Sequence, residues 1–241
     1  IHPEIFKIKK FLKEKNIYLI EDAAHAHGAK IDNIFAGNIG DVGCFSFYST
    51  KIMTTGGEGG FISTNNEELF NLCSSLSAIG IDKKSKNEIY INAGSNNRLT
   101  EFQAILGISQ LNRLESFVNH RNKIADIYKN ILFPLKKDGI IEFQRYPDNI
   151  RHPYWMFIII INNKHYRRID IKEKLKIDNI IVTWPYQPLI HQQPVFSKLN
   201  QHRLIKSEEH ARKHLCIPIH LGITSSDAEY IATKFIECFH N

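Results

Sequence analysis

The sequence predicts an α/β protein in which a larger N-terminal part is followed by a smaller α+β part. Short apolar runs alternate with helical patterns in the N-terminal half, as expected of a parallel sheet covered by helices. Glycine, serine and threonine gather between these elements. From residue 140 onward, strands and helices mix in an order that is typical of a small α+β domain.

The N-terminal elements begin with a helix over 3–15, where Pro3 suits a first turn and apolar residues recur at helical spacing. Residues 17–20 form a continuous apolar run, which predicts a strand buried on both faces. Glu21 and Asp22 come directly after it, at the end of the strand where open α/β sheets bind ligands. Further strands are expected over 43–48 and 61–63, a loop over 49–60 and a helix over 66–76.

The longest helical pattern covers residues 100–132. Thr100 and Gln103 are spaced as a capping box at its start, and Pro134 marks a break after it. Beyond the break, strands are expected over 140–143, 154–161 and 180–183, and helices over 171–176 and 226–239. We therefore predict two domains, residues 1–133 and residues 134–241.

Composition and charge exclude several classes of protein. Of the 241 residues, 43% are hydrophobic and 23% charged, which is globular rather than disordered or collagen-like. The net charge of +6 is scattered, so no nucleic-acid-binding arm is indicated. The longest apolar run, 154–161, is too short for a membrane span, and no signal peptide is recognisable. The four cysteines include no C-x-x-C pair, which argues against a zinc ribbon or a redox dithiol. Cysteines this sparse fit a reducing compartment, so we expect a cytoplasmic protein.

The first segment with chemical potential follows the apolar run at 17–20. Asp22 ends the strand, and the small residues after it let a ligand approach the backbone closely. An isolated acid at such a position more often marks an ordinary strand end and turn. His25 and His27 follow, but two histidines with no third ligand at a useful spacing are a weak indication of a metal site.

The second segment centres on Lys51, which lies among small hydroxyl residues before a glycine-rich loop. The order of residues is not that of a P-loop. A half-buried lysine without an acidic neighbour has a lowered pKa, which favours Schiff-base chemistry. The alternative is a surface lysine in a flexible loop. Ser46, Ser49 and Thr50 can donate hydrogen bonds to a phosphate.

Taken together, the two segments favour one cofactor. Lys51 follows Asp22 by 29 residues, with hydroxyl side chains between them. Pyridoxal phosphate requires a lysine for its Schiff base, an acid that pairs with its protonated pyridine nitrogen, and hydroxyl and backbone groups for its phosphate. The pattern therefore indicates a pyridoxal-phosphate site and no metal site.

Over nearly its whole length, the sequence resembles the pyridoxal-phosphate sugar aminotransferases of the DegT/DnrJ/StrS type. The resemblance rests on IEDAAHAHGA at 20–29, GDVGCFSFYSTK at 40–51, TTGGEGG at 54–60, GSNNRLTEFQA at 94–104, YQPLIH at 186–191 and CIPIH at 216–220. It implies a fold-type I aminotransferase-like large domain, here without its N-terminal part, and a smaller C-terminal α+β domain. The chain starts at Ile1 within an expected helix, so we expect a fragment of a longer protein.

The resemblance also implies the residues that bind the cofactor. Lys51 would form the Schiff base, and Asp22 would pair with the pyridine nitrogen. His25 would lie beside the ring and its 3-hydroxyl, and Ser46 would bind the phosphate. Asn96 would reach the phosphate held by a neighbouring subunit, because this family builds its site at a homodimer interface.

On the substrate side, the resemblance implies that Tyr186 and His191 contact the nucleotide sugar or a carboxylate, and that His220 is structural. The sequence departs from the family pattern at Asn97, where an aromatic is usual, and at Gly56-Gly57, which carries one glycine more. The expected activity is transfer of an amino group, from glutamate, to a nucleotide-linked keto sugar, with no nucleic-acid or membrane partner.

Two alternatives remain open at this point. Some relatives are sugar dehydratases with histidine in place of the lysine, and Lys51 argues against that reaction here. The other alternative is a catalytically inactive fragment that acts as a dimerisation or interaction protein, and the expected loss of an N-terminal segment motivates it.

Overall fold

The structure is a computed structural model that describes residues 1–198 and 203–240 in two compact units. The first unit comprises Ile1–Val118 and Tyr146–Trp155, and the second comprises Asn119–Arg145 and Met156–Asn241. The division into domains 1–133 and 134–241 stays a prediction. The helix α4 (Leu114–Ile131) begins in the first unit and continues in the second.

The first unit is built from short strands and three further helices. Its elements are α1 (Ile5–Glu14), β1 (Ile20–Asp22), β2 (Lys30–Ile31), β3 (Ile34–Phe35), β4 (Val42–Ser46), β5 (Gly60–Ser63), α2 (Glu67–Ser77), α3 (Glu101–Leu111) and β7 (Ile150–Arg151).

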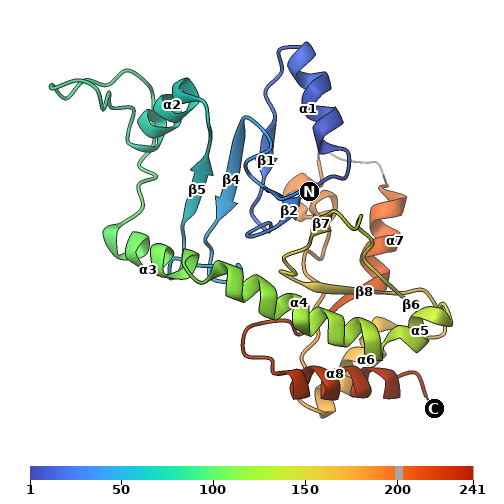
Figure 1. Ribbon diagram of the computed structural model, residues 1–241. Helices are drawn as coiled ribbons and strands as arrows, with labels where there is room; N and C mark the ends of the chain where they lie inside the picture. The colour runs from blue at the N-terminus through green and yellow to red at the C-terminus, as the bar shows by residue number, and fades with distance from the viewer. Residues whose placement is uncertain (199–202, 241) are drawn as a thin grey trace. The chain divides into compact units, whose positions relative to one another are not determined.

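The principal sheet of the first unit has the strand order β1-β4-β5, and Figure 1 shows β4 between its two partners. β1 runs parallel to β4, with Asp22 opposite Cys44 and Glu21 opposite Gly43. β4 and β5 are antiparallel, with Phe45 opposite Phe61. Because neighbours across a sheet share a face and successive residues alternate, Asp22 and Glu21 project to opposite faces.

On its face of the sheet, the Glu21 side chain binds the loop that leads into β4. Its carboxylate accepts hydrogen bonds from the backbone N–H groups of Gly37 (2.8 Å), Ile39 (2.7 Å) and Gly40 (2.5 Å). The same loop lies so close to the sheet that a Cβ on Gly43 would lie 2.3 Å from the Gly37 carbonyl oxygen. The loop is therefore fixed against the strand by charge-assisted hydrogen bonds and close backbone contact.

A small antiparallel sheet with the order β3-β2-β7 completes the first unit. Asp32 and Asn33 join β2 to β3 with positive φ values of 47° and 67°, a conformation that Asp and Asn tolerate better than most residues. Its core consists of Ile31, Ile39 and Ile150, with Ile5 and Tyr146 packed against it.

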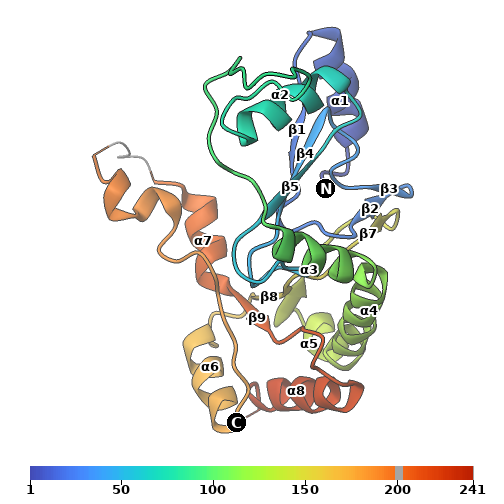
Figure 2. The same ribbon diagram turned by 90° about the vertical axis from the view of Figure 1, so that its left-hand side faces the viewer.

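The second unit is an antiparallel sheet with the order β6-β8-β9 and several helices. Its elements are α5 (Phe133–Lys137), β6 (Ile141–Phe143), β8 (Phe157–Ile161), α6 (Arg168–Ile177), two 3₁₀ turns, η1 (Ile190–Gln192) and η2 (Pro194–Phe196), α7 (Ile205–Lys213), β9 (His214–Ile217) and α8 (Ser225–Glu237). Figure 2 shows α6 beside α8, and the two helices are in contact.

The core of the second unit lies where α4 meets β8 and the segment after β9. Tyr128 is fully buried, its ring lies 5.1 Å from that of Phe157, and its hydroxyl donates to the Pro218 carbonyl at 2.7 Å. The buried Arg121 guanidinium donates to the Ile219 carbonyl. α4 is thus tied to the 218–219 backbone by side chains that satisfy its carbonyl groups.

Most of the expected elements are present, with three corrections. The helix expected over 100–132 is two helices, because the chain tightens after α3, where the Arg113 N–H bonds to the Gln110 carbonyl. The break expected at Pro134 is present, because α4 ends at Ile131 and Pro134 lies in the first turn of α5, a position that tolerates a missing N–H. In place of a strand over 180–183, only Thr183 forms an isolated bridge, to Cys216.

The strand expected over 17–20, buried on both faces, is also wrong. β1 begins at Ile20 and is an edge strand of its sheet. Ile17, Tyr18 and Ile20 are 52%, 64% and 65% exposed. A continuous apolar run signals a buried strand only where other elements cover both its faces, and no such cover lies over this run within the described residues.

Replacing Glu21 with glutamine should destabilise the protein. The amide keeps one carbonyl oxygen and turns an NH₂ group toward N–H donors, so the free energy of unfolding should fall by about 2 kcal/mol. Urea denaturation measures this, and Glu14→Gln, at an exposed position, is the matched control. Equal unfolding midpoints for the two variants would contradict the role given to Glu21.

Candidate active site

The candidate active site lies in the first unit, between the turn after β1 and the loop after β4. Lys51 Nζ lies 2.5 Å from His25 Nε2. The His25 ring stacks on Trp155, with centroids 3.5 Å apart and an interplanar angle of 17°. Lys51 Nζ lies 4.9 Å from the centroid of the Trp155 ring. A lysine, a histidine and an indole from three separate segments therefore form one cluster.

Tight turns after β1 carry His25 to this position. The Ala24 N–H donates to Asp22 Oδ1 at 3.1 Å, and the Ala26 N–H donates to the Ala23 carbonyl at 2.9 Å. The chain therefore turns sharply directly after the acid, and His25 follows Asp22 into the same region.

The loop that carries Lys51 is held by hydroxyl groups and by α3. Thr54 Oγ1 donates to the Phe47 carbonyl at 2.9 Å, and Gln103 Nε2 donates to the Glu58 carbonyl at 2.8 Å. Gly56 has a φ of 84°, which explains a glycine at that position. The expected capping box of Thr100 and Gln103 is present, so Gln103 serves both the helix end and the loop.

Burial lowers the pKa of Lys51 below its ordinary value of 10.5, and the negative charge of Asp22 opposes this shift. Burial lowers the pKa of His25 below its ordinary value of 6.5, and the charge of Lys51 lowers it further. The negative charge of Asp22 opposes both effects. Both shifts favour the neutral forms. When Lys51 donates to His25 Nε2, the imidazole must carry its proton on Nδ1.

Asp22 and Ser46 lie along one face of the principal sheet. Asp22 is opposite Cys44, and Ser46 is two residues farther along β4, so their side chains share that face. The Ser46 hydroxyl accepts a hydrogen bond from the Tyr48 N–H at 3.3 Å. The exposed Asp22 acts electrostatically on Lys51 and on His25. The structure thus brings Asp22, His25 and Lys51 together, with Ser46 on the adjacent strand.

The other expected site residues lie elsewhere. Asn96 is exposed, pairs in a backbone bridge with Ala78, and its side-chain oxygen accepts from Arg98 Nε at 2.9 Å. Tyr186 and His191 belong to the second unit, where His191 Nε2 lies 3.4 Å from Glu208 Oε1. The roles of Asn96, Tyr186 and His191 stay predictions.

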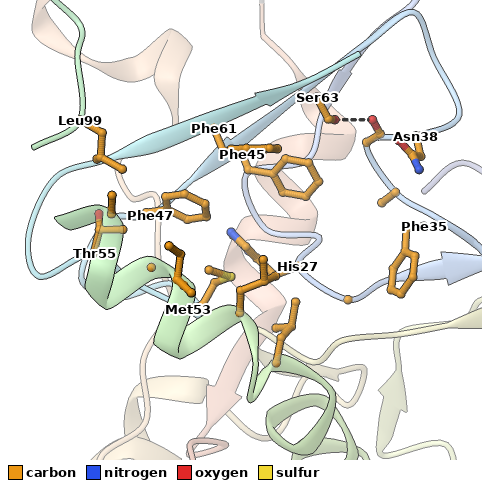
Figure 3. Close-up of a pocket in the computed structure, with 18 of the residues that line it drawn as sticks. His27, Phe35, Asn38, Phe45, Phe47, Met53, Thr55, Phe61, Ser63 and Leu99 are labelled. Atoms are coloured by element: carbon orange, nitrogen blue, oxygen red, sulfur yellow. Dashed lines mark hydrogen bonds between the residues drawn. The ribbon is translucent and has the colours of Figure 1, made fainter. Parts of the chain in front are cut away.

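His27 lies in a different environment from His25. It is 2% exposed, and among the described residues neither ring nitrogen has a hydrogen-bond partner. Its ring faces Phe45 and Phe47, at centroid distances of 5.5 and 5.9 Å (Figure 3). Burial lowers the pKa of His27 to about 4.

The cavity in front of His27 has a volume of about 670 Å³ and an apolar lining from β4, β5 and α3. Phe45 and Phe61 line it, so it opens on the opposite face of β4 from Ser46. At its edge, Ser63 Oγ donates to the Gly37 carbonyl at 2.6 Å, the bond drawn in Figure 3. Among residues 1–198 and 203–240, no group of three or more His, Cys, Asp or Glu side chains is placed to hold a metal ion.

Comparison with known proteins now adds to this geometry. A model of the DegT/DnrJ/EryC1/StrS aminotransferase family matches residues 2–236. The chain belongs to this family. In the part of the chain that the structure describes, no helix combines the length and apolar character needed to cross a membrane.

Among members of the DegT/DnrJ/EryC1/StrS family, the chain is 27% identical over 241 residues to GDP-perosamine synthase of Escherichia coli O157:H7. This alignment covers 99% of the chain and 63% of the synthase. The chain is 30% identical over 200 residues to dTDP-3-amino-3,4,6-trideoxy-alpha-D-glucose transaminase of Micromonospora megalomicea subsp. nigra, covering 80% of the chain and 50% of the relative. The chain therefore spans less than two thirds of the length of these relatives.

A solved DegT DnrJ EryC1 StrS aminotransferase from Brucella abortus superposes on the whole chain with a TM-score of 0.86 at 26% identity, and 62% of that structure is covered. The α/β fold expected from the sequence, and the family resemblance, are confirmed.

Trp155 is the site residue that sequence reasoning missed. It lies at the start of the apolar run 154–161, which predicts only a strand. An indole within such a run gives no local sign that its N–H reaches a loop far away in the sequence.

Replacing Asp22 with asparagine should lower the pKa of Lys51 further, because the carboxylate is the group that opposes the shift caused by burial. After reductive ¹³C-methylation, NMR can follow the titration of Lys51, assigned by its absence from Lys51→Arg. Asp138→Asn, at an exposed position in the second unit, is the matched control. An unchanged or raised pKa of Lys51 in Asp22→Asn would refute the coupling.

Replacing His27 with leucine should flatten the pH dependence of stability in acid. The pKa of His27 is about 4 in the folded protein and near 6.5 in the unfolded chain, so the unfolded chain binds more protons between these values. Stability therefore falls as the pH drops from 6.5 to 4, by up to about 3 kcal/mol. Urea denaturation at several pH values checks this, with His165→Leu as the control for loss of an exposed imidazole. If the stability of His27→Leu depended on pH as strongly as that of the unmodified protein, His27 would not titrate in this way.

Proposed function

We propose that this chain carries the cofactor-binding part of a pyridoxal-phosphate-dependent aminotransferase. The observation that supports it most is the Lys51–His25 contact beside Asp22, where burial favours the neutral form of a lysine close to an acid. The amino-group acceptor is a nucleotide-linked keto sugar and the donor is glutamate. Family membership supports the reaction, and the names of relatives that make GDP- and dTDP-linked amino sugars support the acceptor.

The residues present fit the cofactor. Asp22 offers an exposed carboxylate at the end of β1, suited to a protonated pyridine nitrogen. Ser46 offers a hydroxyl for the phosphate on the same sheet face. Lys51 offers an amine whose pKa is lowered. When bound, pyridoxal phosphate supplies an electron sink for the bonds at the Cα of the amino-acid donor.

The chain's own residues then have distinct tasks. Lys51 Nζ, as a neutral amine, would hold the cofactor and, when free, would take and return the proton at the Cα of the amino-acid donor. His25 accepts a hydrogen bond from Lys51 and orients its amine. Asp22 would supply the negative charge that keeps a bound pyridine nitrogen protonated.

We extend the proposal to the assembly and to the substrate side. The exposed Asn96 reaches the phosphate in a second copy of the chain, in a cytoplasmic homodimer with a shared site. Tyr186 and His191 contact the nucleotide sugar. Lys51 argues against the alternative of a sugar dehydratase, in which histidine takes the place of the lysine.

Lys51→Ala tests the proposal. The unmodified chain should turn yellow on incubation with pyridoxal phosphate, and borohydride reduction should fix one cofactor to Lys51, detected by mass spectrometry. Lys51→Ala should lose both signals and more than about 10³-fold of any turnover with a nucleotide-linked keto sugar. Lys83→Ala, an exposed lysine, is the matched control. A colourless unmodified chain would overturn the proposal and favour an inactive interaction protein.

A further inference from the structure

We propose that Trp155 is a positioning residue that sets the orientation of His25 and the peptide before Lys51. The inference deepens the proposed function and rests on it, because it assigns Trp155 to the site at which Lys51 would hold the cofactor. The contacts among the chain's own residues carry it independently of any bound group.

Trp155 makes three contacts in the cluster, two through its ring and one through its N–H. The ring face stacks on His25, with centroids 3.5 Å apart. The Nε1–H donates to the Thr50 carbonyl at 2.8 Å. The ring also lies 4.9 Å from Lys51 Nζ. One side chain therefore contacts the histidine, the lysine and the peptide bond between Thr50 and Lys51.

The stack and the hydrogen bond fix complementary degrees of freedom. Stacking sets the plane of the imidazole, and in that plane Nε2 meets Lys51 Nζ at 2.5 Å. The bond to the Thr50 carbonyl fixes the backbone from which the Lys51 side chain extends. A lysine has four rotatable bonds, so anchoring its base and its tip reduces the conformations in which the amine misses its partner.

The segment that carries Trp155 is itself held firmly in the first unit. β7 pairs with β2, with Arg151 opposite Lys30. Arg151 Nη1 donates to a carboxylate oxygen of Glu115 at 2.9 Å. Tyr154, next to the indole, is 5% exposed and has a φ of 47°. This left-handed conformation is unfavourable for a bulky residue and is kept only where surrounding packing determines it. The turn buries Tyr154 and presents Trp155 to His25.

A fluorescence titration of the apo protein tests the stack directly. The chain has two tryptophans, so Trp184→Phe leaves Trp155 as the single indole. A protonated imidazole quenches a stacked indole, so the fluorescence should fall as His25 becomes charged, at a pH below the ordinary 6.5. His25→Gln in the same background should abolish the step, and His165→Gln, at an exposed position, should leave it. A step that survives His25→Gln, or no step at all, would overturn the stack.

A second measurement separates positioning from simple packing. The His25 ring proton, followed by NMR, should titrate closer to the ordinary pKa in Trp155→Ala, because the indole that buries one ring face is gone. Trp155→Phe keeps an aromatic face and should restore most of the native titration. An unchanged His25 pKa in Trp155→Ala would refute the inference. If Trp155→Ala does not fold, the fluorescence titration of Trp184→Phe decides.

Cofactor retention then connects the residue to the site. Trp155→Phe loses the N–H donor to Thr50 and should release pyridoxal phosphate several-fold faster than the unmodified chain, while Trp184→Phe should not. Retention equal to that of the unmodified chain would show that the hydrogen bond positions nothing. If the unmodified chain binds no cofactor, the proposed function fails, whereas a fluorescence step that depends on His25 still supports the stack.

Discussion

The parallel pairing of β1 with β4 is the constraint on which the candidate site depends. Its register places Asp22 opposite Cys44, and the alternation of side chains puts Ser46 on the same face. The same alternation sends Glu21 to the other face, where three backbone N–H groups bind it. Glu21 therefore stabilises the loop before β4, whereas Asp22 belongs to the candidate site. A shift of the pairing by one residue would exchange their faces.

Local signals in the sequence predicted much of the fold. The helix expected over 66–76 is α2, because Asn66 caps it with its side chain and two acidic residues follow in the first turn. The β2–β3 hairpin was not predicted, since strands of two residues are too short to show a period. The break between α3 and α4 was missed for another reason: no glycine or proline lies at 112–113 to announce it.

The candidate site was predictable only where cofactor chemistry restricts residue types and spacing. Asp22 and Lys51 lie on segments whose order matches such a requirement, whereas His25 was implied only by the family resemblance. The structure brings the three side chains together. Trp155 was not predictable, because 105 residues separate it from Thr50, the residue to which its N–H donates. Its role arises from tertiary packing, of which an apolar run gives no local sign. Burial of β1 likewise depends on its neighbours rather than on its own residues.

The discontinuity of the first unit has a consequence for biosynthesis. The chain leaves this unit after Val118 and returns to it with Tyr146–Trp155. During translation, the lysine and the imidazole emerge from the ribosome well before the indole that completes their cluster. The cluster therefore cannot assemble until residue 155 has been translated, and a nascent chain stalled short of that residue would hold Lys51 and His25 without their indole partner.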